Sequence, residues 1–278
     1  MSETLKDLMN ASFEQYPDRT AVRILRQADQ PSERRLRYVP ITYQQLKDQR
    51  DRLASGLHRF GLKKGQRVGI LTDGGLEPVL IFLACDMLGL SAVPLCNKLP
   101  DDLLVHNMNH SGVVWLFVDA KSQEQMERVL PRLETAPTIV LTEGQGQEGI
   151  HTFFDLVTEG AKGDPPNVMI EPDDEVKVVY TSGSSGLPKG VVQTHRNLVG
   201  NVRSVWDVMS EREDLILFKS APDYHTMGIL NIYFPLAKGW TLDLARSPDR
   251  VLTDIRHSEP HGFLTVPLIL DKVYGNVR

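Results

Sequence analysis

Short apolar runs alternate with longer helical patterns through the first half of this chain. Glu77–Leu88 is apolar on nearly every side, which predicts a buried helix between two strands. Asp101–His110 predicts a second helix, because its acidic first residues suit the positive end of the helix dipole. This alternation is typical of a parallel sheet covered on both faces. The same pattern predicts a helix at Ser122–Leu133 and strands at Arg67–Thr72, Ser91–Leu95, Val113–Val118 and Thr138–Leu141.

The alternation stops in a region rich in glycine and proline and then starts again. We expect a seam at residues 142–172, between a first subdomain (1–160) and a second one (173–278). Thr194 is expected to cap the helix that follows it. The predicted fold class is α/β, with two packed, mostly parallel sheets and covering helices. In the second half we predict strands at Glu175–Tyr180, Val191–Gln193, Asp214–Lys219, Trp240–Leu244 and Gly262–Val266, and helices at His195–Met209, Thr226–Ala237, Pro248–His257 and Pro267–Val277.

Composition and charge exclude several classes of protein. The chain has 278 residues, of which 41% are hydrophobic and 24% charged, as in ordinary soluble domains. A net charge of −5 gives no footprint for nucleic acid. Only two cysteines are present, which excludes a disulfide scaffold and leaves reduced thiols, one of them in the core. The longest apolar run, Val79–Cys85, is far shorter than the about 20 residues of a membrane span, so we expect a soluble cytoplasmic protein without a transmembrane segment.

The segment Thr181–Gly190, TSGSSGLPKG, carries the strongest chemical signal. It follows a predicted strand and contains four hydroxyl side chains, three glycines and Lys189. Glycines let backbone N–H groups face a ligand, while hydroxyls and a lysine add donors and positive charge. The order of residues differs from a Walker loop, since Lys189 is followed by glycine and not by Ser or Thr. We therefore predict a cradle for a polyphosphate, the alternative being a flexible surface linker.

Tyr180–Val192, continuing into Thr194-His195-Arg196-Asn197, closely resembles the signature of the AMP-forming adenylating enzymes. That superfamily includes acyl-CoA synthetases, adenylation domains of peptide synthetases, and luciferases. Three shorter segments resemble other motifs of the superfamily in order and spacing, and the resemblance covers essentially the whole chain. These segments are Ile41–Leu46, Leu88–Leu95 and Ala221–Gly228.

The resemblance implies a two-step ligase. A carboxylate attacks the α-phosphate of ATP, pyrophosphate leaves, and a thiol, usually that of coenzyme A, takes the acyl group from the adenylate. Lys189 would add positive charge, and His225 matches a position near the acyl and adenylate pocket of relatives. The residues that would hold the β- and γ-phosphates are Thr181, Ser182, Gly183, Ser184, Ser185 and Gly186.

Later motifs of the superfamily do not occur in this sequence. They include the segment that holds adenine and supplies an acidic Mg²⁺ ligand, the aspartate that holds ribose, and a C-terminal lysine. Val266–Tyr274 resembles a helix that precedes the adenine motif in long-chain acyl-CoA synthetases. We therefore expect the N-terminal portion of a ligase whose acid is a fatty acid, and we expect the isolated chain to be inactive.

Two other functions stay open. Tyr224–Gly228 also resembles the fatty acyl-AMP ligases, which pass their product to a carrier-protein thiol. The second alternative is a naturally truncated protein that binds a ligand or a partner without turnover. His106 and His110 stand four residues apart, but Asn107 takes the place of the glutamate of a zinc-protease motif. We expect these two histidines on a solvated helix face, and we predict no metal site.

Overall fold

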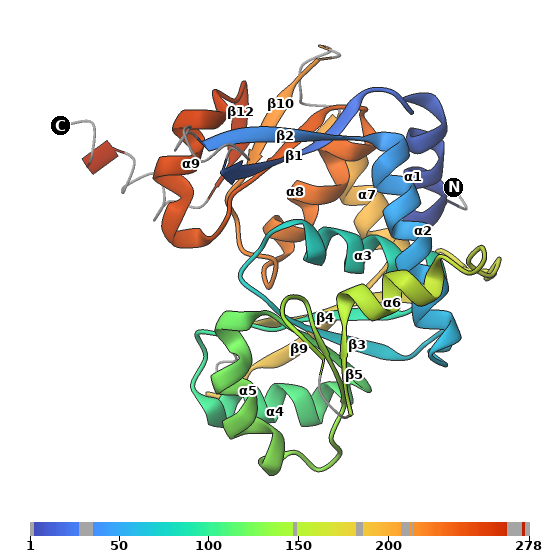
Figure 1. Cartoon of the computed structure of the whole chain (residues 1–278), viewed down its shortest axis with the longest axis vertical. Helices are drawn as coiled ribbons and strands as arrows, with labels where there is room; N and C mark the ends of the chain where they lie inside the picture. The colour runs from blue at the N-terminus through green and yellow to red at the C-terminus, as the bar shows by residue number, and fades with distance from the viewer. Residues whose placement is uncertain are drawn as a thin grey trace. The chain divides into compact units, whose positions relative to one another are not determined.

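A computed structural model describes residues 3–27, 36–146, 149–181, 186–206, 212, 214–265 and 274–275. Contacts divide the chain into two compact units, each assembled from separated segments (Figure 1). The first unit takes residues 1–7, 48–73 and 77–200, and the second takes residues 8–47, 74–76 and 201–278. The units follow contacts and not a single cut in the chain. The predicted seam at residues 142–172, with subdomains 1–160 and 173–278, therefore stays a prediction.

The described part of the first unit holds a seven-stranded sheet. Its neighbouring strands pair in parallel, except the last two, which form an antiparallel hairpin. In spatial order the strands are β7 (Ile150–Thr152), β6 (Thr138–Leu141), β5 (Trp115–Val118), β3 (Arg67–Leu71), β4 (Ser91–Pro94), β8 (Glu175–Thr181) and β9 (Lys189–Thr194). The first strand of the sheet along the chain, β3, is the central one. The next strand, β4, lies on one side of it, and β5, β6 and β7 follow on the other side.

Helices of the first unit bury the apolar side chains of this sheet. α3 (Leu76–Leu88) is buried along nearly its whole length, as its apolar sequence predicts. α4 (Asp101–Ser111) and α5 (Gln123–Val129) contribute Leu104, Met108 and Met126 to a core that also contains side chains of β3, β4, β5, β6 and β8. Short 3₁₀ segments at Ala120–Ser122 and Leu130–Arg132 flank α5.

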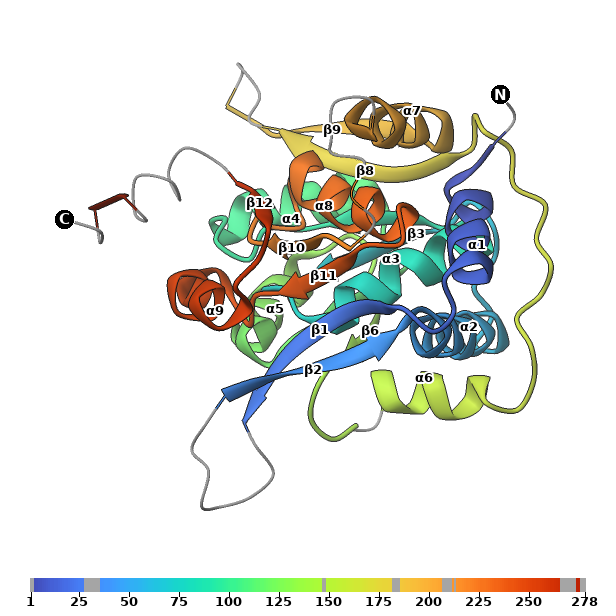
Figure 2. The same cartoon turned by 90° about the horizontal axis from the view of Figure 1, so that it is seen from above.

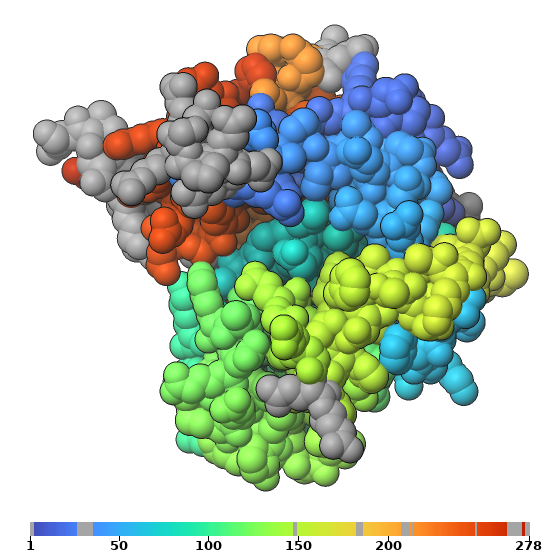
Figure 3. All heavy atoms as spheres, in the orientation of Figure 1, coloured from blue at the N-terminus to red at the C-terminus, as the bar shows by residue number. Residues whose placement is uncertain are grey.

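Two glycines allow α2 (Tyr43–Arg59) and α6 (Phe153–Gly160) to approach backbone to backbone. A Cβ atom on Gly56 would lie 2.0 Å from the carbonyl oxygen of Leu156, and one on Gly160 would lie 1.7 Å from that of Arg52. Figure 3 shows the yellow-green atoms of α6 against the blue atoms of α2. Only glycine fits at either position without a shift of the backbone.

The described part of the second unit holds a five-stranded sheet, also mostly parallel. Its one antiparallel pair is β1 with β2, drawn in blue beside β11 in Figure 2. The strands are, in spatial order, β12 (Gly262–Leu264), β10 (Ile216–Lys219), β11 (Thr241–Leu244), β1 (Thr20–Gln27) and β2 (Leu36–Thr42). Helical segments described in this unit are α8 (Thr226–Ala237), Pro248–Arg250 (3₁₀) and α9 (Val251–Ser258). Two further helices, α1 (Leu5–Gln15) and α7 (His195–Trp206), each begin in the first unit and end in the second.

Buried polar contacts join distant parts of the second unit. Arg23 on β1 lies opposite Asp243 on β11, and its Nε is 2.6 Å from Asp243 Oδ1. The Tyr43 hydroxyl lies 3.0 Å from the carbonyl oxygen of Leu236 and 2.7 Å from that of Trp240. A buried phenol and a buried carboxylate are tolerated here because each has such partners.

The predicted α/β class is confirmed, and most predicted elements are present. The predicted helix Ser122–Leu133 is shorter as an α-helix, because Pro131 lacks the N–H group that would continue it. Residues 274–275, inside the predicted helix Pro267–Val277, are helical, but the rest of that helix and the C-terminal end of His195–Met209 lie outside the described residues. Sequence patterns assigned no element to several segments that the structure places in β1, β2, β7, α1, α2 and α6.

In the part of the chain that the structure describes, no helix has the length and apolar character needed to cross a membrane.

Candidate functional site

The predicted phosphate loop connects the two strands of the β8–β9 hairpin. Thr181 is the last residue of β8 and Lys189 the first of β9, and the two are cross-strand partners. The prediction that Thr181–Gly190 is wholly loop is therefore corrected at both ends, because antiparallel pairing extends to these residues. Of the other predicted phosphate ligands, Ser182, Gly183, Ser184 and Ser185 lie outside the described residues.

The described end of the hairpin faces solvent. Thr181, Gly186 and Lys189 are all exposed, and Gly186 has a left-handed backbone with φ +88°. β8 runs parallel to β4, with Lys177 opposite Ala92, so Thr181 lies at the sheet edge where β3 and β4 end. Ligands of open α/β sheets bind at this edge. A hydroxyl donor and a cation thus stand opposite one another at a position open to a ligand.

The residues just after the hairpin form a capped helix, as predicted. Asn197 N donates to Thr194 Oγ1 over 3.3 Å, and Thr194 N donates to Asn197 Oδ1 over 3.1 Å. This reciprocal cap satisfies two backbone donors at the start of α7. His195, the first residue of α7, is buried, and its Nδ1 accepts a hydrogen bond of 3.2 Å from the backbone N–H of Leu5.

His225 belongs to the second unit and precedes the first residue of α8. Its ring lies 4.6 Å from that of Tyr224, with an angle of 62° between the ring planes. His225 is exposed, and the desolvation that its ring still undergoes lowers its pKa below the ordinary value. The segment just before Tyr224 holds a buried ion pair of 2.6 Å between Lys219 and Asp223. The role predicted for His225 near an acyl pocket stays a prediction.

Comparison with known proteins identifies the family. The family model described as "AMP-binding enzyme" matches residues 9–277. The chain belongs to the AMP-binding enzyme family. Peroxisomal long chain acyl-CoA synthetase 6 of Arabidopsis thaliana is 27% identical over 254 residues, which cover 86% of this chain and 36% of that protein. 4-Coumarate–CoA ligase 2 of rice (Oryza sativa subsp. japonica) is 33% identical over 165 residues, covering 54% of this chain and 28% of that protein.

Solved structures show the same fold. The adenylation domain of a carboxylate reductase from Mycobacterium chelonae superposes with a TM-score of 0.84 at 19% identity, covering 99% of this chain and 47% of that one. At this identity the likeness concerns the fold alone. The chain covers only part of the curated relatives that it matches: 36% of one, 28% of another and 43% of a third.

Two histidines that the sequence analysis placed on a solvated face contact the hairpin of this AMP-binding enzyme. His110 is exposed and His106 half-buried, but each hydrogen-bonds a residue of the β8–β9 hairpin or its loop. Their four-residue spacing was the signal in the sequence, since it places both rings on one face of α4. Their partners, Tyr180 and Pro188, are at least 70 residues away in the chain, so spacing alone could not find them.

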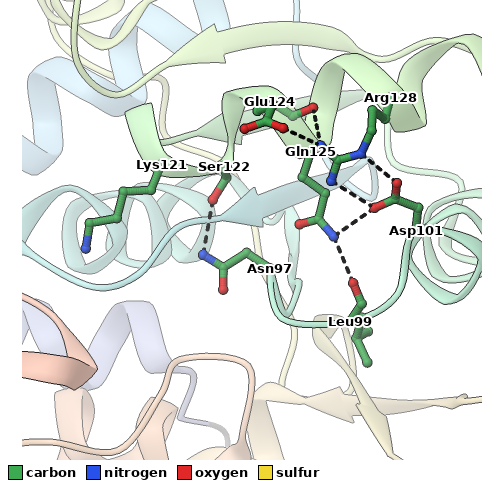
Figure 4. A pocket seen from close by; sticks show the side chains of 8 residues that line it. All are labelled: Asn97, Leu99, Asp101, Lys121, Ser122, Glu124, Gln125 and Arg128. Carbon is green, nitrogen blue, oxygen red and sulfur yellow. Dashed lines mark hydrogen bonds and ion pairs between the residues drawn. The ribbon is translucent and has the colours of Figure 1, made fainter.

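A surface pocket of about 370 Å³ lies beyond the ends of β4 and β5. Arg128 Nε lies 2.8 Å from Asp101 Oδ2, and Arg128 Nη1 lies 3.0 Å from Glu124 Oε1 (Figure 4). Arg128 therefore already pairs with two carboxylates of the same AMP-binding enzyme. None of the predicted site residues is among those that line the pocket. Its lining consists of Asn97, Leu99, Asp101, Lys121, Ser122, Glu124, Gln125 and Arg128.

Nucleophilic and metal-ligating side chains make no further candidate site among the described residues. Burial raises the pKa of the Cys85 thiol to about 12, so this cysteine is an inert core side chain. Among the residues that the structure describes, no three His, Cys, Asp or Glu side chains gather as they would around a metal ion. The donors available at the hairpin are hydroxyl, backbone N–H and ammonium groups, which suit phosphate oxygens.

Proposed function

We propose that this chain is the N-terminal, phosphate-binding portion of an ATP-dependent, AMP-forming carboxylate–CoA ligase. The observation that carries most weight is the exposed pair of Thr181 and Lys189 at the mouth of a glycine- and serine-rich hairpin loop. Membership of the AMP-binding enzyme family and relatives named as CoA ligases support the proposal. The proposed acid is a fatty acid, on the resemblance of Val266–Tyr274 and the name of the Arabidopsis relative.

The proposed reaction has two steps. A carboxylate oxygen attacks the α-phosphorus of ATP, and the bond from this phosphorus to the oxygen that bridges it to the β-phosphorus breaks. Pyrophosphate departs, and the product is an acyl-adenylate. The thiol of coenzyme A then attacks the acyl carbon, and AMP leaves. Neither step needs a nucleophile from the protein, so catalysis depends on position and on neutralising phosphate charge. A loop rich in donors and poor in acids fits that requirement.

Each predicted site residue has a proposed task. Lys189 adds positive charge beside the leaving pyrophosphate, and His225 lies near the acyl and adenylate pocket. Mg²⁺ enters with ATP as part of the substrate. The β- and γ-phosphates are held by Thr181, Ser182, Gly183, Ser184, Ser185 and Gly186.

Calorimetric titration of the chain with ATP and with pyrophosphate tests the phosphate-binding part of the proposal. We expect the double variant Thr181→Ala/Lys189→Ala to lose binding of both ligands. Lys63→Ala is the matched control, because it also removes one exposed positive charge. Lys63 lies in the turn before β3, at the end of the sheet where the parallel strands begin, and Thr181 lies at the other end. Unchanged affinity in the double variant would refute the assignment of the loop.

Catalysis is tested by a separate assay. We expect no acid-dependent exchange of radiolabelled pyrophosphate into ATP when the 278-residue chain is assayed alone. Exchange by the chain alone would show that residues outside it are not needed for adenylation.

The proposal has two further parts. We propose that the ligase acts in the cytoplasm. The alternative second step is transfer of the acyl group to the thiol of a carrier protein instead of coenzyme A.

A further inference from the structure

Helix α4 contacts the end of the β8–β9 hairpin through two histidines. His106 Nε2 lies 3.2 Å from the carbonyl oxygen of Pro188, and His110 Nδ1 lies 2.8 Å from the Tyr180 hydroxyl oxygen. The two imidazole rings stack on each other, with centroids 5.8 Å apart and 24° between their planes. One helix thus contacts the chain on both sides of the loop at once.

Hydrogen-bonding chemistry assigns each ring its proton. A carbonyl oxygen only accepts, so His106 must donate through Nε2–H to Pro188. The Tyr180 hydroxyl donates its own proton to the carbonyl oxygen of Asn107 over 2.9 Å, so its oxygen accepts from His110 Nδ1–H. The partner therefore sets which ring nitrogen donates: Nε2 in His106 and Nδ1 in His110.

The strand opposite Tyr180 leaves room for this contact. Gly190 is the cross-strand partner of Tyr180, and a Cβ atom there would lie 3.0 Å from Val178 Cγ1 and 3.5 Å from His110 Cε1. The Tyr180 and His110 rings meet edge to face, 5.8 Å apart, beside it. A side chain at position 190 would have to displace neighbours that already fill the space.

We propose that His106 and His110 are positioning residues of the phosphate-binding hairpin. Tyr180 immediately precedes Thr181, and Pro188 immediately precedes Lys189. Holding Tyr180 and Pro188 on the rigid face of α4 fixes where the Thr181 hydroxyl and the Lys189 ammonium stand. This inference rests on the proposed function of the hairpin in binding phosphate, and it assigns the two histidines no contact with the ligand.

Asparagine and glutamine substitutions give a test that depends on which ring nitrogen is used. The amide nitrogen of asparagine takes the place of Nδ1, and that of glutamine reaches the place of Nε2. We expect His106→Gln and His110→Asn to keep the affinity of the chain for pyrophosphate. We expect His106→Asn and His110→Gln to bind pyrophosphate about three- to tenfold more weakly, which is the worth of one hydrogen bond. His58→Gln, at an exposed position near the end of α2, is the matched control.

A second measurement reads the hairpin without any ligand. Hydrogen–deuterium exchange of peptides covering β8 and β9 should be faster in His106→Asn and His110→Gln than in the wild type, and unchanged in the other two variants. The Tm of all four variants should agree closely. Equal exchange in the asparagine and glutamine variants at each position, or changes that simply follow Tm, would overturn the positioning role.

The two measurements separate this inference from the proposed function. If the wild-type chain binds neither ATP nor pyrophosphate, the phosphate-binding proposal fails, while the exchange pattern still decides whether the histidines hold the hairpin. If the wild type binds pyrophosphate and all four variants bind it equally, the positioning role fails and the proposed function stands.

Discussion

Lys177 Nζ lies 2.5 Å from Asp86 Oδ1 in the core of the first unit, where only 0% and 2% of the two side chains are exposed. Lys177 comes from β8 and Asp86 from α3, so the pair joins the strand that leads into the phosphate loop to the most buried helix. The ammonium group also lies 5.2 Å from the centre of the Phe82 ring. Neither charge could stay buried alone, because taking an ion out of water is costly without a partner.

Removal of one partner of this pair should therefore cost more than removal of both. We expect Lys177→Met to lower the free energy of unfolding by about 3–5 kcal/mol, and Lys177→Met/Asp86→Leu to lower it by clearly less. Urea denaturation measures both values. As a control, Lys162→Met, which removes an exposed ion pair with Glu159, should change stability by less than about 1 kcal/mol. Additive losses in the double variant would contradict the interpretation.

His195 should make stability depend on pH. Burial lowers the pKa of this ring, although the nearby carboxylate of Asp86 opposes the effect, and the unfolded value is 6.5. Above pH 6.5 the ring is neutral in both states and its stabilisation is complete. As the pH falls below 6.5 the unfolded chain takes up the proton first, so stability falls by at most about 1.4 kcal/mol per pH unit. His195→Asn keeps an acceptor for the Leu5 N–H but cannot titrate, so its denaturation midpoint should lose this part of the slope between pH 7.5 and 5.5. Identical slopes would refute it.

The same substitution should have opposite effects in two helices. Gly56→Ala places a Cβ atom 2.0 Å from the Leu156 carbonyl oxygen, so we expect a loss of about 1–3 kcal/mol despite the better helix propensity of alanine. Gly200 lies on the exposed side of α7, where an added Cβ would meet no described atom within 4 Å apart from its chain neighbours and its own helix backbone. Gly200→Ala should stabilise the protein by about 0.5–1 kcal/mol. Thermal or urea unfolding that gives the same sign for both variants would show that the contact between α2 and α6 is looser than described.

The cap of α7 offers a smaller, local prediction. Thr194→Ala removes the hydroxyl that accepts from Asn197 N, and we expect a loss of about 1 kcal/mol. Thr194→Ser keeps an equivalent hydroxyl and should stay within about 0.5 kcal/mol of the wild type. Urea denaturation compares the two. A serine variant as unstable as the alanine variant would mean that the methyl group of Thr194, and not its hydroxyl, stabilises the helix start.

Local patterns predicted those elements whose signals lie within their own sequence. Thr138–Leu141 and Thr226–Ala237 were predicted with the bounds that the structure has, because each is a short, strongly apolar run between clear turn signals. The Thr194 cap was predicted from residue type alone. In the candidate site, the residue types of Thr181–Gly190 predict a phosphate loop with Lys189, and the resemblance of Tyr180–Val192 points to the same segment.

Elements and contacts that depend on distant partners were missed. β1 carries Arg23 and Arg26, so it did not resemble a buried strand, and only the pairing of Arg23 with Asp243, 220 residues away, explains a charge there. The contacts of His106 and His110 with the hairpin were missed for the same reason. Sequence spacing reports which residues share a helix face, but not what the fold brings against that face.

The interleaving of the two units bears on how this protein folds while it is being made. β1 and β2 are complete by residue 42, but β11, the parallel neighbour of β1, ends only at residue 244. At about 5–20 residues per second on the ribosome, the about 200 residues between them take about 10–40 s to synthesise. Throughout that time the N-terminal hairpin lacks its neighbour and exposes a strand edge. Nascent chains of this protein therefore need protection from aggregation until the second unit can close.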